Sequence, residues 1–230
     1  MWIEIFLCLL LAHLVADFVL QTNKICQDKA EKKWRSAHHY GHAAVVSGLS
    51  WLATWDLGFW WCALLIGLTH LGIDMWKSYR DEEVKWFTID QLFHLGVLAG
   101  VAWLWCKGCS WHMPFDIELW QVAATIAVIT CWEPANIFIK LMLKHCSVNM
   151  PQENGSGFIA GALIGTTERW LILIFVFLQR YDALGLLIAA KSIIRFGEKE
   201  TAKTEYVLAG TLLSIFIAVL AGILVRGVID

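Results

Sequence analysis

Eight long apolar runs, separated by short polar segments, dominate this sequence. A helix needs about 20 mostly apolar residues to cross the hydrocarbon core of a membrane. The runs cover residues 2–20, 38–55, 58–75, 87–106, 117–139, 158–178, 184–196 and 206–225. The sequence lacks the alternation of polar and apolar residues that a membrane β-barrel needs. The pattern predicts an all-α polytopic membrane protein with about eight transmembrane helices in a bundle, or seven if the sixth is broken or re-entrant.

The composition also favours a membrane environment. Hydrophobic residues make up 58% of the 230 positions and charged residues only 17%, whereas about 25% of the residues of an ordinary soluble domain are charged. The 18 basic and 20 acidic residues are too few for the polar surface of a soluble protein of this length. Their near-balance also excludes a nucleic-acid-binding protein that works through a basic face.

The positions of the basic residues favour one orientation in the membrane. Most of them lie in the first, third, fifth and seventh loops, at Lys24, Lys29, Lys32, Lys33, Arg35, Lys77, Arg80, Lys85, Lys140, Lys144, Lys199 and Lys203. The alternate loops contain little more than Lys107 and Arg180. Because cytoplasmic loops carry an excess of Lys and Arg, the pattern predicts that the odd-numbered loops are cytoplasmic and that both termini are non-cytoplasmic.

Ionisable side chains occur in the first four apolar runs in a regular pattern. Each costs about 2.5–3.5 kcal/mol at the centre of a membrane helix on insertion scales, so each needs a reason. The pairs with a spacing of four residues are His13/Asp17, His38/His42, His70/Asp74 and Asp90/His94. This spacing places both members of a pair on one face of a helix. All four pairs border the first or third loop, so we expect them to meet in the cytoplasmic third of the bilayer.

Imidazole and carboxylate groups together are the ligands of zinc, manganese and iron. Helical bundles build metal sites from such pairs on facing helices. The sequence therefore predicts a divalent metal site, with zinc favoured and manganese or iron as alternatives. The expected ligands are His13, Asp17, His42, His70, Asp74, Asp90 and His94. The alternative is a His–Asp hydrogen-bond network that only holds the helices together.

Three motifs of this region are similar to those of a known family. They are H-L-V-A-D-F-V-L-Q at residues 13–21, H-L-G-I-D-M-W-K at 70–77 and F-T-I-D-Q-L-F-H-L at 87–95. The likeness covers roughly residues 5–100 and resembles a bacterial integral membrane family of unknown function, domain of unknown function 3307, often encoded beside a SatD-type protein. In that pattern the second helix has one main histidine, which matches His42. The resemblance implies a multi-pass protein of the bacterial inner (plasma) membrane and brings no established activity.

The second half of the chain has buried charges of its own. Glu168 and Arg169 interrupt the sixth apolar run, and Lys191 and Arg195 have four-residue spacing near the end of the seventh. These residues would form either ion pairs, such as Glu168 with Lys191, or an anion site that faces the histidine cluster. We predict two four-helix membrane units, residues 1–106 with the His/Asp cluster and residues 107–230 with the buried Glu, Lys and Arg.

The favoured function is a metal-dependent hydrolase of a lipid-borne ester, amide or phosphate near the cytoplasmic face. A metal would lower the pKa of its bound water towards neutrality. We expect Asp74, Asp90 and Lys77 to be catalytic, the carboxylates as general base or orienting groups and Lys77 as a contact for negative charge. The expected substrate-binding residues are Gln21, Gln91, Glu168, Lys191 and Arg195. The sequence has no nucleophile motif such as G-x-S-x-G, so covalent catalysis has no support.

Two further functions stay open at this point. One is a transporter or channel for a metal ion or small anion, although transporters usually place such sites near the bilayer midplane. The other is a non-catalytic membrane scaffold with a cytosolic partner at the basic first loop. The expected partners are membrane lipid, with no nucleic acid, and a homo-oligomer is left open. Cys106 and Cys109 form a C-x-x-C near His112, which favours either a zinc or redox site or a local disulfide.

Overall fold

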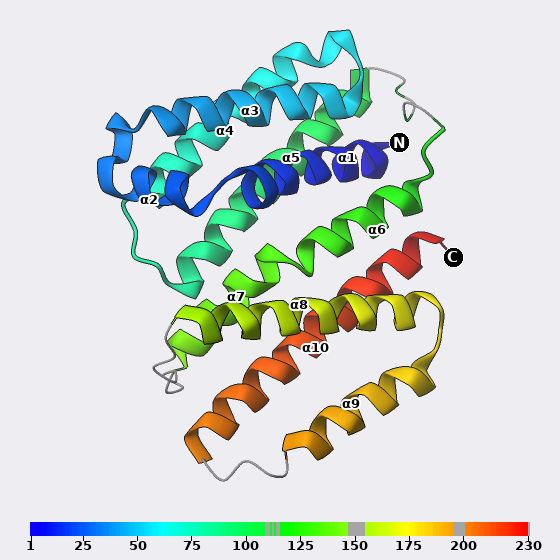
Figure 1. Ribbon diagram of the computed structural model, residues 1–230. Coiled ribbons are helices and arrows are strands. Elements are labelled where there is room, and N and C mark those ends of the chain that lie inside the picture. The colour runs from blue at the N-terminus through cyan, green and yellow to red at the C-terminus, as the bar shows by residue number, and fades with distance from the viewer. Residues whose placement is uncertain (109–110, 112, 114–115, 147–154, 196–200, 230) are drawn as a thin grey trace. The chain divides into compact units, whose positions relative to one another are not determined.

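The computed structural model describes residues 1–108, 111, 113, 116–146, 155–195 and 201–229, with the side chains of all of these except 155–160, 194–195 and 201–207. Within this part of the chain the fold is all-α (Figure 1). The α-helices are α1 (Trp2–Leu14), α2 (Asn23–Lys32), α3 (Ala37–Thr54), α4 (Trp60–Lys77), α5 (Val84–Gly108), α6 (Leu119–Thr130), α7 (Glu133–His145), α8 (Gly155–Phe177), α9 (Tyr181–Arg195) and α10 (Thr201–Ile229). Three short helical segments are η1 (Val15–Leu20), η2 (Lys33–Arg35) and η3 (Leu57–Phe59).

The chain divides into two compact units. Unit 1 is Met1–Ile126 and unit 2 is Ala127–Asp230, so the division falls within α6. The predicted boundary at residues 106 and 107 lies in the last turn of α5, before this division, and the two four-helix units stay a prediction. Each unit has its own helix packing and its own buried polar residues.

Unit 1 is built around α1, α3, α4 and α5. In this group α1 packs against α3 and α5, and α4 packs against the same two helices (Figure 1). The apolar core lies toward one end of the group, where the first half of α1 and of α4 meets the later half of α5, with Leu9, Ile66 and Ala102 almost fully buried. The polar residues of the same helices lie toward the other end.

The contact between α3 and α4 is close because Gly67 has no side chain. A Cβ atom added there would lie 1.9 Å from Ser47 Oγ and 2.9 Å from the carbonyl oxygen of Ala43. This approach brings the start of α3 against the later part of α4. It therefore places His42 and His70 in one region, with their ring centroids 5.0 Å apart.

Four helical stretches are long and apolar enough to cross a membrane among the described residues. They are Trp2–Leu20, Leu57–Lys77, Val84–Gly108 and Leu208–Ile229. The pair Leu119–Thr130 and Glu133–His145 counts as a fifth if the 41° bend between its helices lies within one broken span. The structure thus supports a multi-pass membrane protein with four or five spans.

The predicted count of eight spans is not supported. In the second predicted span, α3 opens with His38, His39 and His42, which lower its apolar character, and in the seventh α9 has only 15 residues. The sixth, α8, has described side chains only from residue 161 onward. The placement of both termini outside the cytoplasm depends on the span count and stays a prediction.

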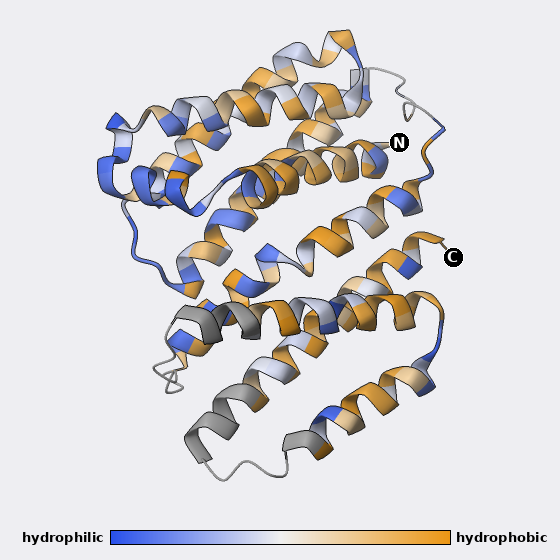
Figure 2. Ribbon diagram, in the orientation of Figure 1, coloured by the Kyte–Doolittle hydropathy of each residue, from blue (hydrophilic) through white to orange (hydrophobic). Residues whose placement is uncertain are grey.

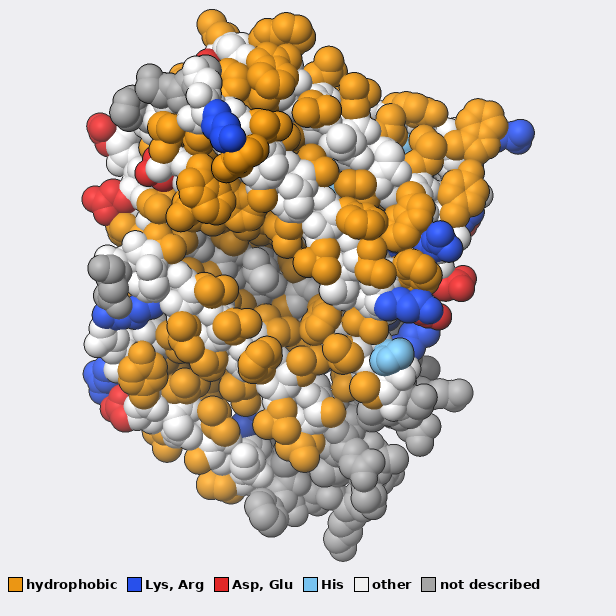
Figure 3. All heavy atoms as spheres, turned by 180° about the vertical axis from the view of Figure 1, so that it is seen from behind, with side chains coloured by type: hydrophobic (Ala, Val, Ile, Leu, Met, Phe, Trp, Pro, Cys, Tyr) orange, Lys and Arg blue, Asp and Glu red, His pale blue; other side chains and the backbone are white. Residues whose placement is uncertain are grey.

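Apolar side chains are widespread on the surface of both units. Leu57, Leu186 and Phe216 are 80%, 72% and 63% exposed. In Figure 3 hydrophobic side chains cover most of the face that is shown, and charged side chains form small groups. Figure 2 shows that α2 is hydrophilic, in contrast to the apolar α1. Such a surface suits lipid rather than water, because soluble monomers rarely expose large contiguous apolar patches.

Unit 2 is organised around Arg169, which is only 1% exposed. Its guanidinium group donates to the carbonyl oxygen of Cys131 at 2.7 Å, to Asn136 Oδ1 at 2.6 Å, and to Ser214 Oγ and Thr166 Oγ1, both at 3.0 Å. These partners come from the α6–α7 bend and from α7, α8 and α10. The arginine predicted to interrupt the sixth apolar run therefore joins the helices of unit 2.

Candidate metal centre

The orientation of the first two cluster residues, His13 and Asp17, depends on a change from α-helix to π-helix. His13 lies in the last turn of α1, and Asp17 lies in η1, which is a π-helical segment. A π-turn is wider than an α-turn and is frequent at functional sites. His13 is 2% exposed, and its Nδ1 is 3.8 Å from Asp17 Oδ1. The helix therefore turns both side chains towards the interior of unit 1.

The other cluster residues come from three further helices. Ser36 caps the start of α3 by accepting a hydrogen bond from the backbone of His38, which fixes the first turn ahead of His42. His70 and Asp74 lie one turn apart near the end of α4, and Asp90 and His94 lie one turn apart near the start of α5. The histidines of these pairs are 2% and 3% exposed.

Asp17 is the centre of one group. Its Oδ1 atom is 3.1 Å from His42 Nε2 and 3.5 Å from His70 Nε2. One ligand atom from each of these three residues lies within 4.8 Å of the other two. Two imidazoles and one carboxylate are thus gathered around one point, contributed by η1, α3 and α4.

Asp74, Asp90 and His94 form a second group. Its ligand atoms also lie within 4.8 Å of one another. His94 Nε2 is 3.5 Å from Asp90 Oδ1 and 3.8 Å from Asp74 Oδ1. A third combination joins His13 to His70 and His94 within the same limit, and the His70 and His94 rings stack with centroids 4.2 Å apart. The two groups are therefore neighbours.

Several atoms at the centre lack a normal hydrogen bond. In the described part of the chain, His70 Nε2, His94 Nε2 and Asp90 Oδ1 are buried and have no hydrogen-bond partner. They face other ligand atoms at 3.5–3.8 Å. Atoms bound to one tetrahedral zinc ion at about 2.0–2.1 Å lie about 3.4 Å from each other. The spacing is therefore compatible with a shared cation.

Two lysines hold the outer oxygens of the carboxylates. Lys29 Nζ donates to Asp74 Oδ2 at 2.6 Å, and Lys77 Nζ donates to Asp90 Oδ2 at 3.4 Å. In both carboxylates the remaining Oδ1 atom faces His94. Hydrogen bonds to the outer atoms of metal-binding groups orient them and tune their basicity. The lysines therefore leave one oxygen of each carboxylate directed at the imidazoles.

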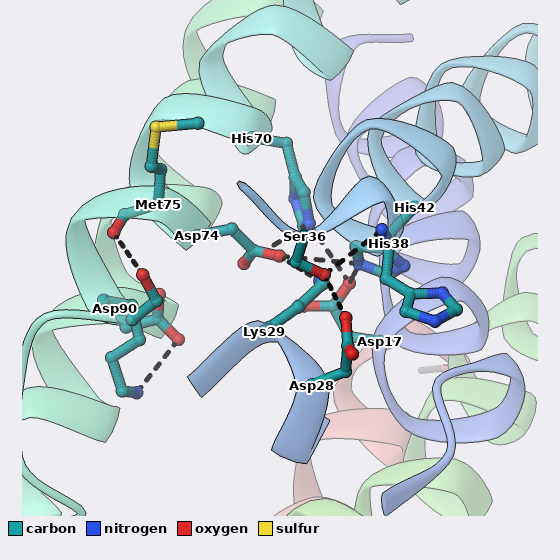
Figure 4. A network of polar contacts seen from close by, with 12 residues as sticks. Asp17, Asp28, Lys29, Ser36, His38, His42, His70, Asp74, Met75 and Asp90 are labelled. Carbon is teal, nitrogen blue, oxygen red and sulfur yellow. Dashed lines mark hydrogen bonds and ion pairs between the residues drawn. The ribbon is translucent and has the colours of Figure 1, made fainter. Parts of the chain in front are cut away.

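Lys29 reaches the cluster because α2 folds back over it from the first loop. Lys29 is 5% exposed and extends from α2 towards Asp74 (Figure 4). Two hydrogen bonds fix the C-terminal part of α2. Ser36 Oγ donates to Asp28 Oδ2 at 2.5 Å, and Lys33 Nζ donates to the carbonyl oxygen of Ser78. Hydrogen bonds from Lys32 and Ser36 lower the pKa of the Asp28 carboxyl below its ordinary value. This part of the basic first loop is thus a helix that covers the cluster.

All seven predicted metal ligands lie in this one cluster. His38, the partner of His42 in the spacing pattern, is exposed. Gln91, which we expected to bind substrate, instead lies between two cluster residues. Its Oε1 is 3.4 Å from His13 Nε2, and its Nε2 donates to Asp90 Oδ2 at 3.2 Å. Gln21 directly follows η1 and is half-buried.

The expected substrate residues of the second half lie in unit 2. Lys191 Nζ donates to Glu168 Oε2, which is the ion pair that the sequence left open as an alternative to an anion site. The side chain of Arg195 lies outside the described residues, and so do Cys109 and His112, so the roles expected of them stay predictions.

A family model matches residues 5–131, and its description is a protein of unknown function, DUF3307. The match covers more than half of the chain. The chain belongs to the DUF3307 family. The matched region includes every residue of the cluster and Lys29, so the DUF3307 domain coincides with most of unit 1. No curated protein and no solved structure matches the chain.

The contribution of Lys29 to this DUF3307 domain was not predicted. Its position among several lysines of a polar loop indicated only a cytoplasmic, basic segment. One signal was present, since the residues from 23 to 32 contain few helix breakers and Lys29 lies one turn from Lys32 and Lys33. That signal indicates a helix but not which lysine it buries.

Proposed function

We propose that unit 1 is a membrane-embedded metal centre that hydrolyses a lipid-borne ester, amide or phosphate. The observation that carries the proposal is that three buried ligand atoms, His70 Nε2, His94 Nε2 and Asp90 Oδ1, have no hydrogen-bond partner and lie 3.5–3.8 Å from other ligand atoms of the cluster. Desolvating such groups costs free energy unless a partner compensates for it. A divalent cation, with zinc as the first choice, is the partner that suits this donor set.

The proposed reaction is hydrolysis by a water molecule whose pKa is lowered at the metal centre. A divalent ion lowers the pKa of a bound water to near 7. Asp90 or Asp74 accepts the proton of the water. The water oxygen forms a bond to the acyl carbon or phosphorus, the bond to the leaving oxygen or nitrogen breaks, and the proton passes to the leaving group. Lys77, which is 25% exposed, holds the negative charge of the substrate.

The location of the cluster supports a substrate at a membrane surface. His13 and Asp17, His70 and Asp74 lie near the ends of their spans, beside the polar segments that contain α2 and residues 78–83. Because the segment that contains α2 is rich in Lys and Arg, we propose that this end faces the cytoplasm, in a bacterial inner membrane. A lipid headgroup at that interface is then within reach of the centre.

Hydrolysis is tested with the purified protein in mixed micelles that contain phospholipid, with release of acyl chains and of phosphate measured by mass spectrometry. We expect turnover to stop after removal of metal by a chelator and to return with Zn²⁺, Mn²⁺ or Fe²⁺. His70→Ala should lower turnover at least about tenfold, because loss of even an outer partner of a metal ligand typically costs about 10–100-fold. His38→Ala, on the exposed face of α3, is the matched control and should keep full activity.

Metal-loaded protein that hydrolyses no ester, amide or phosphate lipid in this assay would refute the hydrolase and leave the metal centre itself intact. Equal turnover in the His70→Ala and His38→Ala proteins would show that the observed hydrolysis does not use the cluster.

A further inference from the structure

We propose that the cluster holds two divalent ions bridged by Asp74 and that its substrate is a phosphate ester. This inference rests on the proposed function and deepens it. The ligand groups are the starting point, because two of the three combinations share no residue. One is Asp17, His42 and His70, and the other is Asp74, Asp90 and His94. Each offers three ligands, which is the number that leaves positions open for water or substrate.

Asp74 lies between the two groups. Its Oδ1 is 3.8 Å from His94 Nε2 in its own group and 3.6 Å from His70 Nε2 in the other. Its Oδ2 is 3.9 Å from His42 Nε2, which also belongs to the other group. Oδ1 thus faces an imidazole of each group, and Oδ2 faces a second imidazole of the Asp17 group. That is the position of a bridging ligand in a two-metal site, where the ions lie about 3.5–4 Å apart.

The ammonium group of Lys29 lies where a metal ion would contact the Oδ2 atom of Asp74. This ammonium group donates to Asp74 Oδ2, the oxygen that also faces His42. A second ion that binds to Asp17, His42 and His70 would compete with Lys29 for this oxygen. Lys29 extends from α2, which belongs to the first loop and not to one of the packed spans (Figure 4). The ammonium group can therefore withdraw without a change in the packing of α1, α3, α4 and α5.

The charge of the centre favours a phosphate ester over a neutral ester or amide. Asp17, Asp74 and Asp90 contribute three negative charges, and Lys77 contributes one positive charge once Lys29 has withdrawn. The set then has a net charge of −2 with neutral imidazoles, and two divalent ions change it to +2. Such an excess of positive charge in a buried site requires bound anions. A two-metal site also stabilises both the attacking and the leaving oxygen at phosphorus. A phosphate group with two negative charges balances the excess.

The number of metal ions bound per protein molecule tests this proposal. Metal-free protein is equilibrated with Zn²⁺, the excess is removed, and zinc is counted by mass spectrometry in the wild type, His42→Ala, Asp90→Ala and the control His38→Ala. We expect two ions in the wild type and the control and one ion in each of the other two. With Mn²⁺ in place of zinc, electron paramagnetic resonance should show two coupled ions in the wild type and an isolated ion in both single-group variants.

A second arm tests the ligand class with inorganic phosphate as the probe. Calorimetric titration should detect phosphate binding to the zinc-loaded wild type and a loss of at least about tenfold in affinity in His42→Ala and Asp90→Ala. One zinc ion in the wild type would overturn the two-ion proposal and leave the proposed function standing, whereas no zinc would overturn both. Two ions that remain in both variants would also overturn it, because they would lie outside the two groups. Equal phosphate affinity in all proteins would refute the phosphate ester as substrate class.

Discussion

Lys29→Met is expected to lower the thermal midpoint of the metal-free protein by about 10 °C. The ammonium group is buried and donates to Asp74 at 2.6 Å, with the two side chains 6% and 15% exposed. Removal of one partner from a buried ion pair costs about 3–5 kcal/mol, because the other charge stays buried without compensation. In a chain of this size a loss of 1 kcal/mol in the free energy of unfolding lowers the thermal midpoint by about 2–4 °C. The measurement is thermal unfolding in detergent, followed by tryptophan fluorescence in the presence of a chelator.

The same variant should recover most of its stability when Zn²⁺ is added, because the metal ion then compensates the buried negative charge of Asp74. Lys32→Met is the matched control, since Lys32 lies on the same helix, is 61% exposed and pairs with Asp28 at the surface. Its midpoint should stay close to that of the wild type with and without metal. A Lys29→Met protein as stable as Lys32→Met under chelation would mean that the contact with Asp74 contributes nothing to the fold.

Arg169→Met should destabilise unit 2 by about 3–5 kcal/mol. The substitution keeps an apolar side chain in the space but removes four hydrogen bonds, which leaves the carbonyl oxygen of Cys131 and the side chains of Asn136, Thr166 and Ser214 with lost partners. Each buried polar group that loses its partner costs about 1–3 kcal/mol. We expect protease cleavage of unit 2 at a lower temperature than in the wild type, with little change in the metal content of unit 1.

Arg180→Met is the control for this second substitution. Arg180 is 63% exposed and pairs with Asp182 at the surface, so its removal should leave the cleavage temperature nearly unchanged. Loss of the metal centre together with unit 2 in the Arg169→Met protein would show that the two units do not fold independently.

The convergence of the cluster could be predicted from the sequence because it depends on local periodicity. A four-residue spacing places His70 beside Asp74 and Asp90 beside His94 on any α-helix, and the nearby loops set a common depth. The same argument failed for His38 and His42. The two histidines share a face of α3, but His38 lies one turn nearer to the start of the helix and is exposed, whereas His42 lies beside Asp17.

Features that depend on tertiary contacts could not be predicted. The burial of Lys29 follows from the packing of α2 over the spans, and the sequence of α2 resembles an ordinary polar loop. The pairing of Lys191 with Glu168 was one of two open interpretations, because a four-residue spacing does not show which helix lies opposite. Eight spans are not supported among the described residues, because an apolar run such as 184–196 can form a helix, here α9 with 15 residues, that is too short to cross a membrane.

The metal content of the purified protein tests the central claim most directly. Wild type is compared with the double variant His70→Ala/Asp74→Ala, which removes one ligand from each group, and circular dichroism verifies that both proteins remain helical. We expect one or two equivalents of zinc, manganese or iron in the wild type, two if both groups are filled, and less than about a tenth of that amount in the variant. A helical wild type that holds no metal even after reconstitution would contradict the account and make the cluster a hydrogen-bond network.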